Sequence, residues 1–112
     1  MHISLLDPAP TAKCLFKRKE QRLVPDAAGC YVLTTFEGEV LYVGLSVSLK
    51  SRLGQHLDDK RKTGPTSLGR AFFFHWVERT DLERVERTWM NTHTLHEGKL
   101  PELNGAYSPV ST

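Results

Sequence analysis

The sequence predicts a small α/β (α+β) domain in which a three-stranded antiparallel sheet is flanked by helices. Residues 29–36 and 39–44 are rich in β-branched and aromatic residues, and residues 71–77 form a third apolar run of strand length. Residues 47–62 and 81–96 carry apolar residues at helical spacing. The order strand, strand, helix, strand, helix is typical of an antiparallel sheet covered by helices. A length of 112 residues leaves room for one core.

The chain divides into three parts. Residues 1–28 contain three prolines, lack clean periodicity and are interpreted as an irregular or partly helical N-terminal extension. Residues 29–104 form the domain proper, and residues 105–112 form a C-terminal tail. No apolar run reaches the roughly 18–20 residues that span a bilayer, and the N-terminus lacks the pattern of a secretory signal. We therefore expect no membrane partner and a cytoplasmic location.

Cys14 and Cys30 are the two cysteines of the chain. Two cysteines cannot build a disulfide framework, and neither belongs to a CxxC or Cys/His zinc spacing. Reduced cytosolic thiols are the expected state of both.

Basic residues concentrate in two stretches, although the net charge of +2 is too small to indicate nucleic-acid binding by itself. Residues 13–22 contain five Lys or Arg against one Glu, and residues 47–62 contain five against two Asp. Together they are candidates for an electrostatic contact with phosphate, with solvated surface as the alternative. Lys50, in the second stretch, is a candidate substrate-binding residue.

The first two strand-like runs predict a hairpin around the two-residue turn Glu37-Gly38. In that register Leu33 lies opposite Tyr42, and Tyr31 lies opposite Gly44. Tyr31 and Tyr42 then share one face of the sheet, and the glycine leaves open space beside the Tyr31 ring. The two tyrosines are candidates for a shared site, with simple packing as the alternative.

The helical segments are defined by their apolar stripes and caps. Leucines recur at four-residue spacing in the first segment, at Leu49, Leu53 and Leu57. Ser46 or Ser48 is suited to cap this helix, and residues 63–67 end it. Thr80 or Asp81 is suited to cap the second helix.

Arg52 and His56 lie one helical turn apart at the border of the leucine stripe. A side chain at this border can reach into a cleft while its helix stays packed. The planar guanidinium of arginine suits phosphate, because it binds two oxygens together and keeps its charge. The alternatives are a surface arginine and a rim histidine bonded to backbone.

Glu86 falls inside the apolar arc of the second helix, among Val85, Trp89 and Met90. An ionised carboxylate in such a place is costly unless it is paired or binds a cation. A structural salt bridge, with Arg52 as an eligible partner, is one interpretation. The other is a carboxylate that holds a hard divalent ion through oxygen.

The tripeptides Gly29-Cys30-Tyr31 and Tyr42-Val43-Gly44 are separated by ten residues, and Arg52, His56, Glu86 and the closing Pro101-x-x-Asn104 follow them. With this combination, residues 29–104 resemble the GIY-YIG nuclease superfamily. Cys30 and Val43 take the places of two isoleucines, which are small apolar exchanges. Either tripeptide alone is a weak motif, whereas the pair followed by an arginine and a helical glutamate is specific.

The resemblance implies a three-stranded antiparallel sheet with flanking helices and metal-dependent cleavage of DNA, with Mg²⁺ or Mn²⁺ as the ion. It assigns proton transfer at the attacking water to Tyr31, and support of that network or contact with the phosphate to Tyr42. It assigns stabilisation of the phosphate to Arg52 and the single metal-binding carboxylate to Glu86. Asn104 matches a tail asparagine that fixes the site, and it joins Gly44 as a candidate substrate-binding residue.

We therefore predict a metal-dependent endonuclease that hydrolyses DNA phosphodiester bonds. Tyr31 is the predicted general base or proton relay, and His56, which matches a histidine in some branches of the superfamily, is its competitor. The alternatives are a catalytically inactive DNA-binding or assembly module that keeps the fold, and a subunit of a larger nuclease or repair complex. The sequence leaves open whether the DNA is single-stranded, duplex or branched, and what the oligomeric state is.

Overall fold

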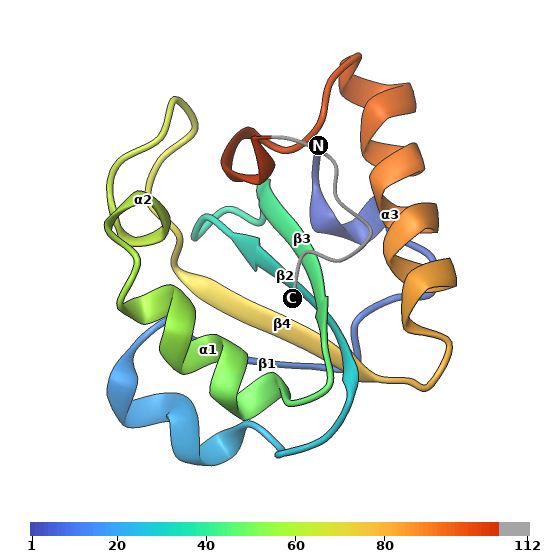
Figure 1. Cartoon of the computed structure of the whole chain (residues 1–112). Helices are drawn as coiled ribbons and strands as arrows, with labels where there is room; N and C mark the ends of the chain where they lie inside the picture. The colour runs from blue at the N-terminus through green and yellow to red at the C-terminus, as the bar shows by residue number, and fades with distance from the viewer. Residues whose placement is uncertain (106–112) are drawn as a thin grey trace.

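The computed structural model describes residues 1–105, so residues 106–112 of the predicted tail lie outside the described part. The sheet consists of β1 (Ala12–Leu15), β2 (Gly29–Thr34), β3 (Val40–Ser46) and β4 (Phe73–Glu78). Its order is β1-β4-β2-β3, with all neighbours antiparallel (Figure 1). The α-helices are α1 (Leu49–Leu57), α2 (Lys60–Thr63) and α3 (Leu82–Glu97), and the 3-10 helices are η1 (Ile3–Leu5), η2 (Arg18–Leu23) and η3 (Glu102–Asn104).

β1 is an addition to the predicted three-stranded sheet, and the predicted strand count is wrong by this one strand. It lies within residues 1–28, which were expected to be irregular or partly helical and which also hold η1 and η2. β1 pairs with β4, with Cys14 opposite Phe74. Cys14 and Phe16 are buried while Lys13 is exposed. An alternation this short does not stand out among prolines and charged residues, so the sequence pattern did not reveal it.

The register of the β2–β3 hairpin agrees with the prediction, but its turn does not. Leu33 pairs with Tyr42, and Tyr31 pairs with Gly44, as expected. The turn is longer than Glu37-Gly38, because the Thr35 N–H donates to the Glu39 carbonyl. A β-bulge or irregularity between Leu33 and Thr34 shifts the pairing by one residue and restores the predicted alignment.

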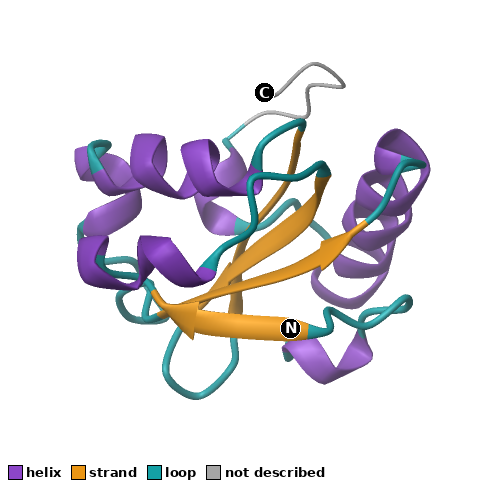
Figure 2. Cartoon of the chain, turned by 90° about the horizontal axis from the view of Figure 1, so that it is seen from below, coloured by secondary structure: helices purple, strands orange, loops and turns teal. Residues whose placement is uncertain are grey.

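The two faces of the sheet carry two hydrophobic clusters. Tyr31 and Tyr42 pack with Leu49 and Leu53 of α1 on one face. The opposite face packs against α3, whose contributions include Val85 and Trp89. Figure 2 shows the sheet between α3 on one side and α1 with its neighbouring helices on the other. A residue of α1 and a residue of α3 can therefore meet only around an edge of the sheet.

The single helix predicted over residues 47–62 is instead two helices, α1 and α2. Ser48 caps α1 by accepting from the Ser51 N–H. Asp59 is extended and starts α2, because its carboxylate accepts from the Arg61 N–H at 2.9 Å. The aspartate thus interrupts the helix, which the leucine spacing alone could not show.

The third predicted strand and the second predicted helix are confirmed as β4 and α3. Asp81 precedes α3 as expected, and Gly98 ends this helix in a left-handed conformation with φ of 74°. Cys14 and Cys30 are both buried and free of disulfides. Over residues 1–105, no helix is both long and apolar enough to cross a membrane.

Candidate active site

The two motif tyrosines stack on the α1 face of the sheet, as their predicted register requires. Their ring centroids are 5.9 Å apart with 25° between the planes. Tyr31 also stacks on Phe74 of β4 at 5.1 Å. Tyr31 is fully buried, whereas Tyr42 is 7% exposed. Tyr42 is therefore the less completely buried residue of the pair.

Gly44 determines the position of the Tyr31 ring. A Cβ atom at residue 44 would lie 2.5 Å from both Cζ and the hydroxyl oxygen of Tyr31. The space that the sequence predicts beside Tyr31 is therefore filled by the tyrosine itself. In the structure Gly44 has a packing role. A direct role for Gly44 in substrate binding stays a prediction.

His56 reaches the Tyr31 hydroxyl from α1, with 2.6 Å between Nε2 and the hydroxyl oxygen. The imidazole is also buried, and its ring lies 5.0 Å from the Tyr42 ring. Burial, followed by the positive charges of Lys62 and Arg52, lowers the pKa of His56 to about 3. His56 is therefore neutral at physiological pH, and its Nε2 can accept the phenolic proton.

Arg52 acts on both phenols. Burial and the neighbouring Tyr42 raise the pKa of Tyr31 well above its ordinary value, while the charge and hydrogen bonding of Arg52 oppose this shift. Burial also raises the pKa of Tyr42, and hydrogen bonding with Tyr31 and the charge of Arg52 lower it in part. The guanidinium thus lies with the two hydroxyls, as its predicted place at the border of the stripe requires.

Glu86 belongs to the same neighbourhood although α3 covers the other face of the sheet. It is 1% exposed, and Val85, Trp89 and Met90 are buried with it, as the predicted apolar arc requires. Its negative charge contributes to the raised pKa values of Tyr42 and of Cys30, the latter about 12. Glu86 is therefore within electrostatic range of the Tyr42 phenol.

The donor set around Glu86 suits only certain metals. Among the described residues, no three His, Cys, Asp or Glu side chains gather as a metal-binding group. Structural and catalytic zinc sites use three or four protein ligands, so the set does not fit zinc. Mg²⁺ keeps several waters and takes substrate phosphate oxygens beside one or two carboxylates. A lone carboxylate fits an ion of that kind, shared between protein and substrate.

Lys62 is a residue of this cluster that the sequence did not single out. Its side chain on α2 is buried, and its Nζ lies 4.6 Å from the centroid of the Tyr42 ring. Nζ also contacts Asp59 Oδ2 at 3.4 Å. In the sequence Lys62 is one of five basic residues of the 47–62 stretch. Only the break between α1 and α2 turns it inward, and that break was not predicted.

Two predicted substrate-binding residues, Asn104 and Lys50, make contacts through backbone groups of the protein. Both polar atoms of the Asn104 amide bond to the backbone of Val43, at 3.1 Å to the N–H and 2.9 Å to the carbonyl. Asn104 thus fixes η3 on β3, and its role in holding the active site stays a prediction. Lys50 is roughly 160° around α1 from Arg52, on the side where its carbonyl accepts from Gln21. Binding of DNA by either residue stays a prediction.

The two basic stretches lie beside each other. η2, from the first stretch, packs along α1, from the second (Figure 1). Arg18 pairs with Asp58 across this contact. Arg18, Lys19, Arg22 and Lys60 are exposed, so the two stretches together carry several exposed basic side chains.

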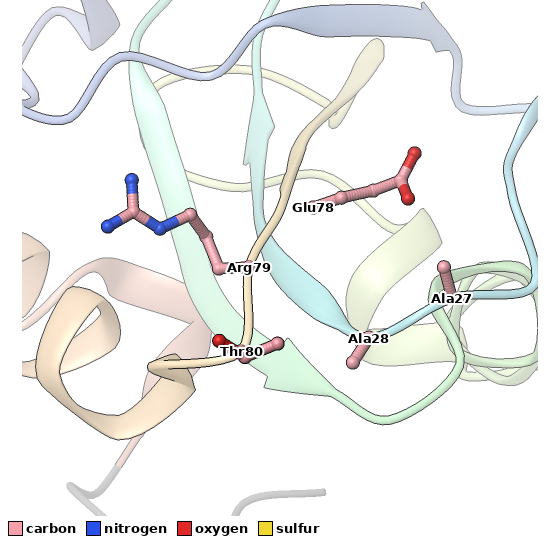
Figure 3. Close-up of a pocket in the computed structure, with 5 residues that line it drawn as sticks. All are labelled: Ala27, Ala28, Glu78, Arg79 and Thr80. Atoms are coloured by element: carbon pink, nitrogen blue, oxygen red, sulfur yellow. The ribbon is translucent and has the colours of Figure 1, made fainter.

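A cavity of about 490 Å³ lies elsewhere on the molecule. It is lined by Ala27, Ala28, Glu78, Arg79 and Thr80, where β4 leads toward α3 (Figure 3). None of the predicted site residues lines it. The Arg79 guanidinium is engaged by both oxygens of Asp81, at 2.8 and 2.9 Å. The cavity is therefore separate from the predicted site, although the Glu78 carboxylate lines it.

Comparison with known proteins bears on the same residues. A family model described as the GIY-YIG catalytic domain matches residues 27–95. The chain is 36% identical over 45 residues to UvrABC system protein C of Finegoldia magna. The matched segment covers 40% of this chain and 7% of that protein. It is also 36% identical over 52 residues to UvrABC system protein C of Alkaliphilus metalliredigens. That matched segment covers 46% of this chain and 8% of that protein. The matches thus span less than a tenth of these relatives.

We expect Gly44→Ala to destabilise the domain by about 1–3 kcal/mol, because the added methyl overlaps the Tyr31 ring in a packed core. Urea unfolding measures the change. Gly54→Ala is the matched control, since its Cβ would meet the end of the flexible Gln21 side chain. A Gly44→Ala protein as stable as the wild type would contradict the packing role of Gly44.

Acid should destabilise the protein partly through His56. The folded pKa of about 3 lies below the ordinary value of 6.5, so the unfolded chain binds the proton first as the pH falls. Stability contributed by neutral His56 is present above pH 6.5 and is lost toward pH 3. His75, with its pKa lowered to about 4 by burial, adds in the same direction.

Between pH 7 and pH 4 we expect the His56 contribution to the free energy of unfolding to fall by about 3 kcal/mol. Urea unfolding at a series of pH values measures this slope. His56→Gln should flatten it, whereas His96→Gln, at an exposed position, should not. Equal slopes in the wild type and His56→Gln would show that His56 is not held neutral.

Proposed function

The chain belongs to the GIY-YIG family of catalytic domains, and on that premise we propose that it is a metal-dependent endonuclease that hydrolyses DNA phosphodiester bonds. The observation that carries the proposal is the buried Tyr31–His56 hydrogen bond of 2.6 Å beside Tyr42 and Arg52. A phenol bonded to a neutral imidazole, next to a fixed positive charge, is the arrangement that a proton relay at a phosphate needs.

Tyr31 is proposed as the middle of a relay. Its raised pKa argues against a free phenolate, so Tyr31 must pass its own proton on as it takes another. The acceptor is His56 Nε2. Tyr42, hydrogen-bonded to Tyr31 and less completely buried, is proposed to face the attacking water. In this scheme Tyr31 and His56 act together instead of competing for the role of base.

Arg52 is proposed to hold a non-bridging oxygen of the scissile phosphate. Its charge already acts on both phenols, so a phosphate paired with Arg52 lies next to their hydroxyls. The bound anion would also offset the positive charge that helps to lower the pKa of His56. Substrate binding then makes the imidazole a better proton acceptor at the moment when one is needed.

Glu86 is proposed as the protein ligand of Mg²⁺ or Mn²⁺. Its burial on α3 and its electrostatic effect on Tyr42 support a place beside the phosphate that Arg52 holds. When bound, the ion supplies positive charge to the phosphate oxygens that become more negative during attack. No other carboxylate is assigned to it.

The alternative is an inactive DNA-binding or assembly module. Such a module has no need for a phenol, an imidazole, a guanidinium and a carboxylate close together, and their convergence favours the enzyme. The curated relatives are named as protein C of the UvrABC system and extend far beyond the matched segment. We propose accordingly that this domain can act within a larger nuclease or repair complex that selects the DNA.

Glu86→Gln tests the metal assignment. The amide keeps the shape of the side chain but loses the charge that a hard cation requires. We expect cleavage to fall by about 100-fold or more. The measurement is cleavage of plasmid and of single-stranded, duplex, flap and junction oligonucleotides with Mg²⁺, with Mn²⁺ or with EDTA. Glu83→Gln, on an exposed turn of the same helix, is the matched control.

Three outcomes of this experiment contradict parts of the proposal. Undiminished cleavage by Glu86→Gln removes Glu86 from metal binding. Undiminished cleavage in EDTA removes the metal. Salt-dependent DNA binding without cleavage of any substrate favours the inactive module.

Tyr31→Phe and His56→Gln, alone and combined, test the relay. Phenylalanine keeps the stacking on Tyr42 and Phe74 but has no hydroxyl to pass the proton. We expect each single change to lower kcat by about 100-fold and the double change to lower it little further, because the two groups act as one unit. Single-turnover cleavage measures the rates. A double variant whose loss is the product of the two single losses would show independent roles.

A further inference from the structure

We propose that Lys62 is a positioning residue of the active site, whose buried ammonium fixes the ring of Tyr42 and thereby the relay of phenols and imidazole behind it. The inference rests on the proposed nuclease function. It concerns a residue that neither the motif pattern nor the family resemblance identifies.

The contacts of Lys62 converge on the site. Its Nζ lies over the face of the Tyr42 ring, 4.6 Å from the centroid. The same ring stacks on Tyr31 and meets His56 edge-on, with 67° between the planes. Tyr42 is thus held by a cation, a phenol and an imidazole. A shift of the Tyr42 ring would therefore disturb its hydrogen bond with Tyr31.

The burial of Lys62 is costly, which argues against an incidental placement. The residue is 6% exposed, and an ammonium group taken out of water loses favourable hydration. Its ion pair with Asp59 is long, at 3.4 Å, and Asp59 is itself 40% exposed. The pair is therefore a weak compensation, and the aromatic face of Tyr42 is the second partner of the charge.

A series of contacts that joins α2, η3 and β3 keeps α2 in place for this role. Asp59 begins α2, and Arg61 donates to the Leu103 carbonyl of η3 at 3.0 Å. Asn104 then ties η3 to Val43, the neighbour of Tyr42 on β3. The contact of Lys62 on α2 with the Tyr42 ring on β3 is the last of the series. Of these links, Lys62 is the one that brings a charge onto a predicted catalytic ring.

Lys62→Met, Lys62→Arg and Lys60→Met form the test set. Methionine keeps the length of the side chain without the charge, arginine keeps a cation that can lie over the ring, and Lys60 is an exposed lysine of the same helix. Single-turnover and steady-state cleavage give kcat and KM. Spectra of ¹³C-labelled tyrosine and lysine, recorded without DNA, report the ring contact, because protons above an aromatic face shift upfield.

We expect Lys62→Met to lower kcat about tenfold beyond any loss in Lys60→Met, with KM unchanged relative to that control. Lys62→Arg should recover most of the rate. In the wild type the Lys62 Hε signals should be shifted upfield, and Lys62→Met should move the ring signals of both Tyr42 and Tyr31.

Three results overturn the inference. They are wild-type kcat in Lys62→Met, a rise in KM alone, which indicates direct phosphate binding, and tyrosine spectra that Lys62→Met leaves unchanged. If the wild type cleaves no DNA, the proposed function fails, and the spectra alone then decide whether Lys62 holds the rings.

Discussion

The contact of the Tyr31 ring with Gly44 across the β2–β3 hairpin is the constraint on which the site depends. No side chain fits at residue 44 once the ring is in place, because even a Cβ would overlap it. The ring in turn supports Tyr42 by stacking and presents its hydroxyl to His56. A small shift of β3 against β2 would therefore disturb the phenols and the imidazole together. Gly44, Tyr31 and Tyr42 therefore pack as one unit, and the chemistry proposed for the tyrosines depends on this packing.

The electrostatics of this unit depend on charges placed around a buried aromatic centre. Arg52 and Lys62 act on His56 from the α1 and α2 side, and both lower its pKa. Glu86 acts on Tyr42 with the opposite sign. Asp59 adds a second negative charge, because it pairs with Lys62 and acts on His56 in the direction opposite to the two cations. The cations beside the two phenols are consistent with the proposed binding of an anionic phosphate.

The sequence was informative where a local periodicity determines the side on which a residue lies. The two-residue period of the strands located Tyr31 against Gly44, and the helical period located Arg52 and His56 on one border and Glu86 in the core. It failed where long-range packing decides. β1 is defined by its pairing with β4, and the inward position of Lys62 follows from the helix break at Asp59. Neither has a periodic signature of its own.

The position of β3 at the edge of the sheet explains how groups from opposite faces act on one phenol. α1 and α3 cover different faces, so a central strand would separate Arg52 from Glu86. Around an edge strand both reach Tyr42, and the pKa of that phenol responds to both. An edge also exposes backbone groups that invite strand addition. Asn104 binds the N–H and carbonyl of Val43 at this place. Asn104 thus covers the exposed backbone groups of Val43 on the edge strand. The side chains of the two sheet faces can still act on Tyr42 around this edge.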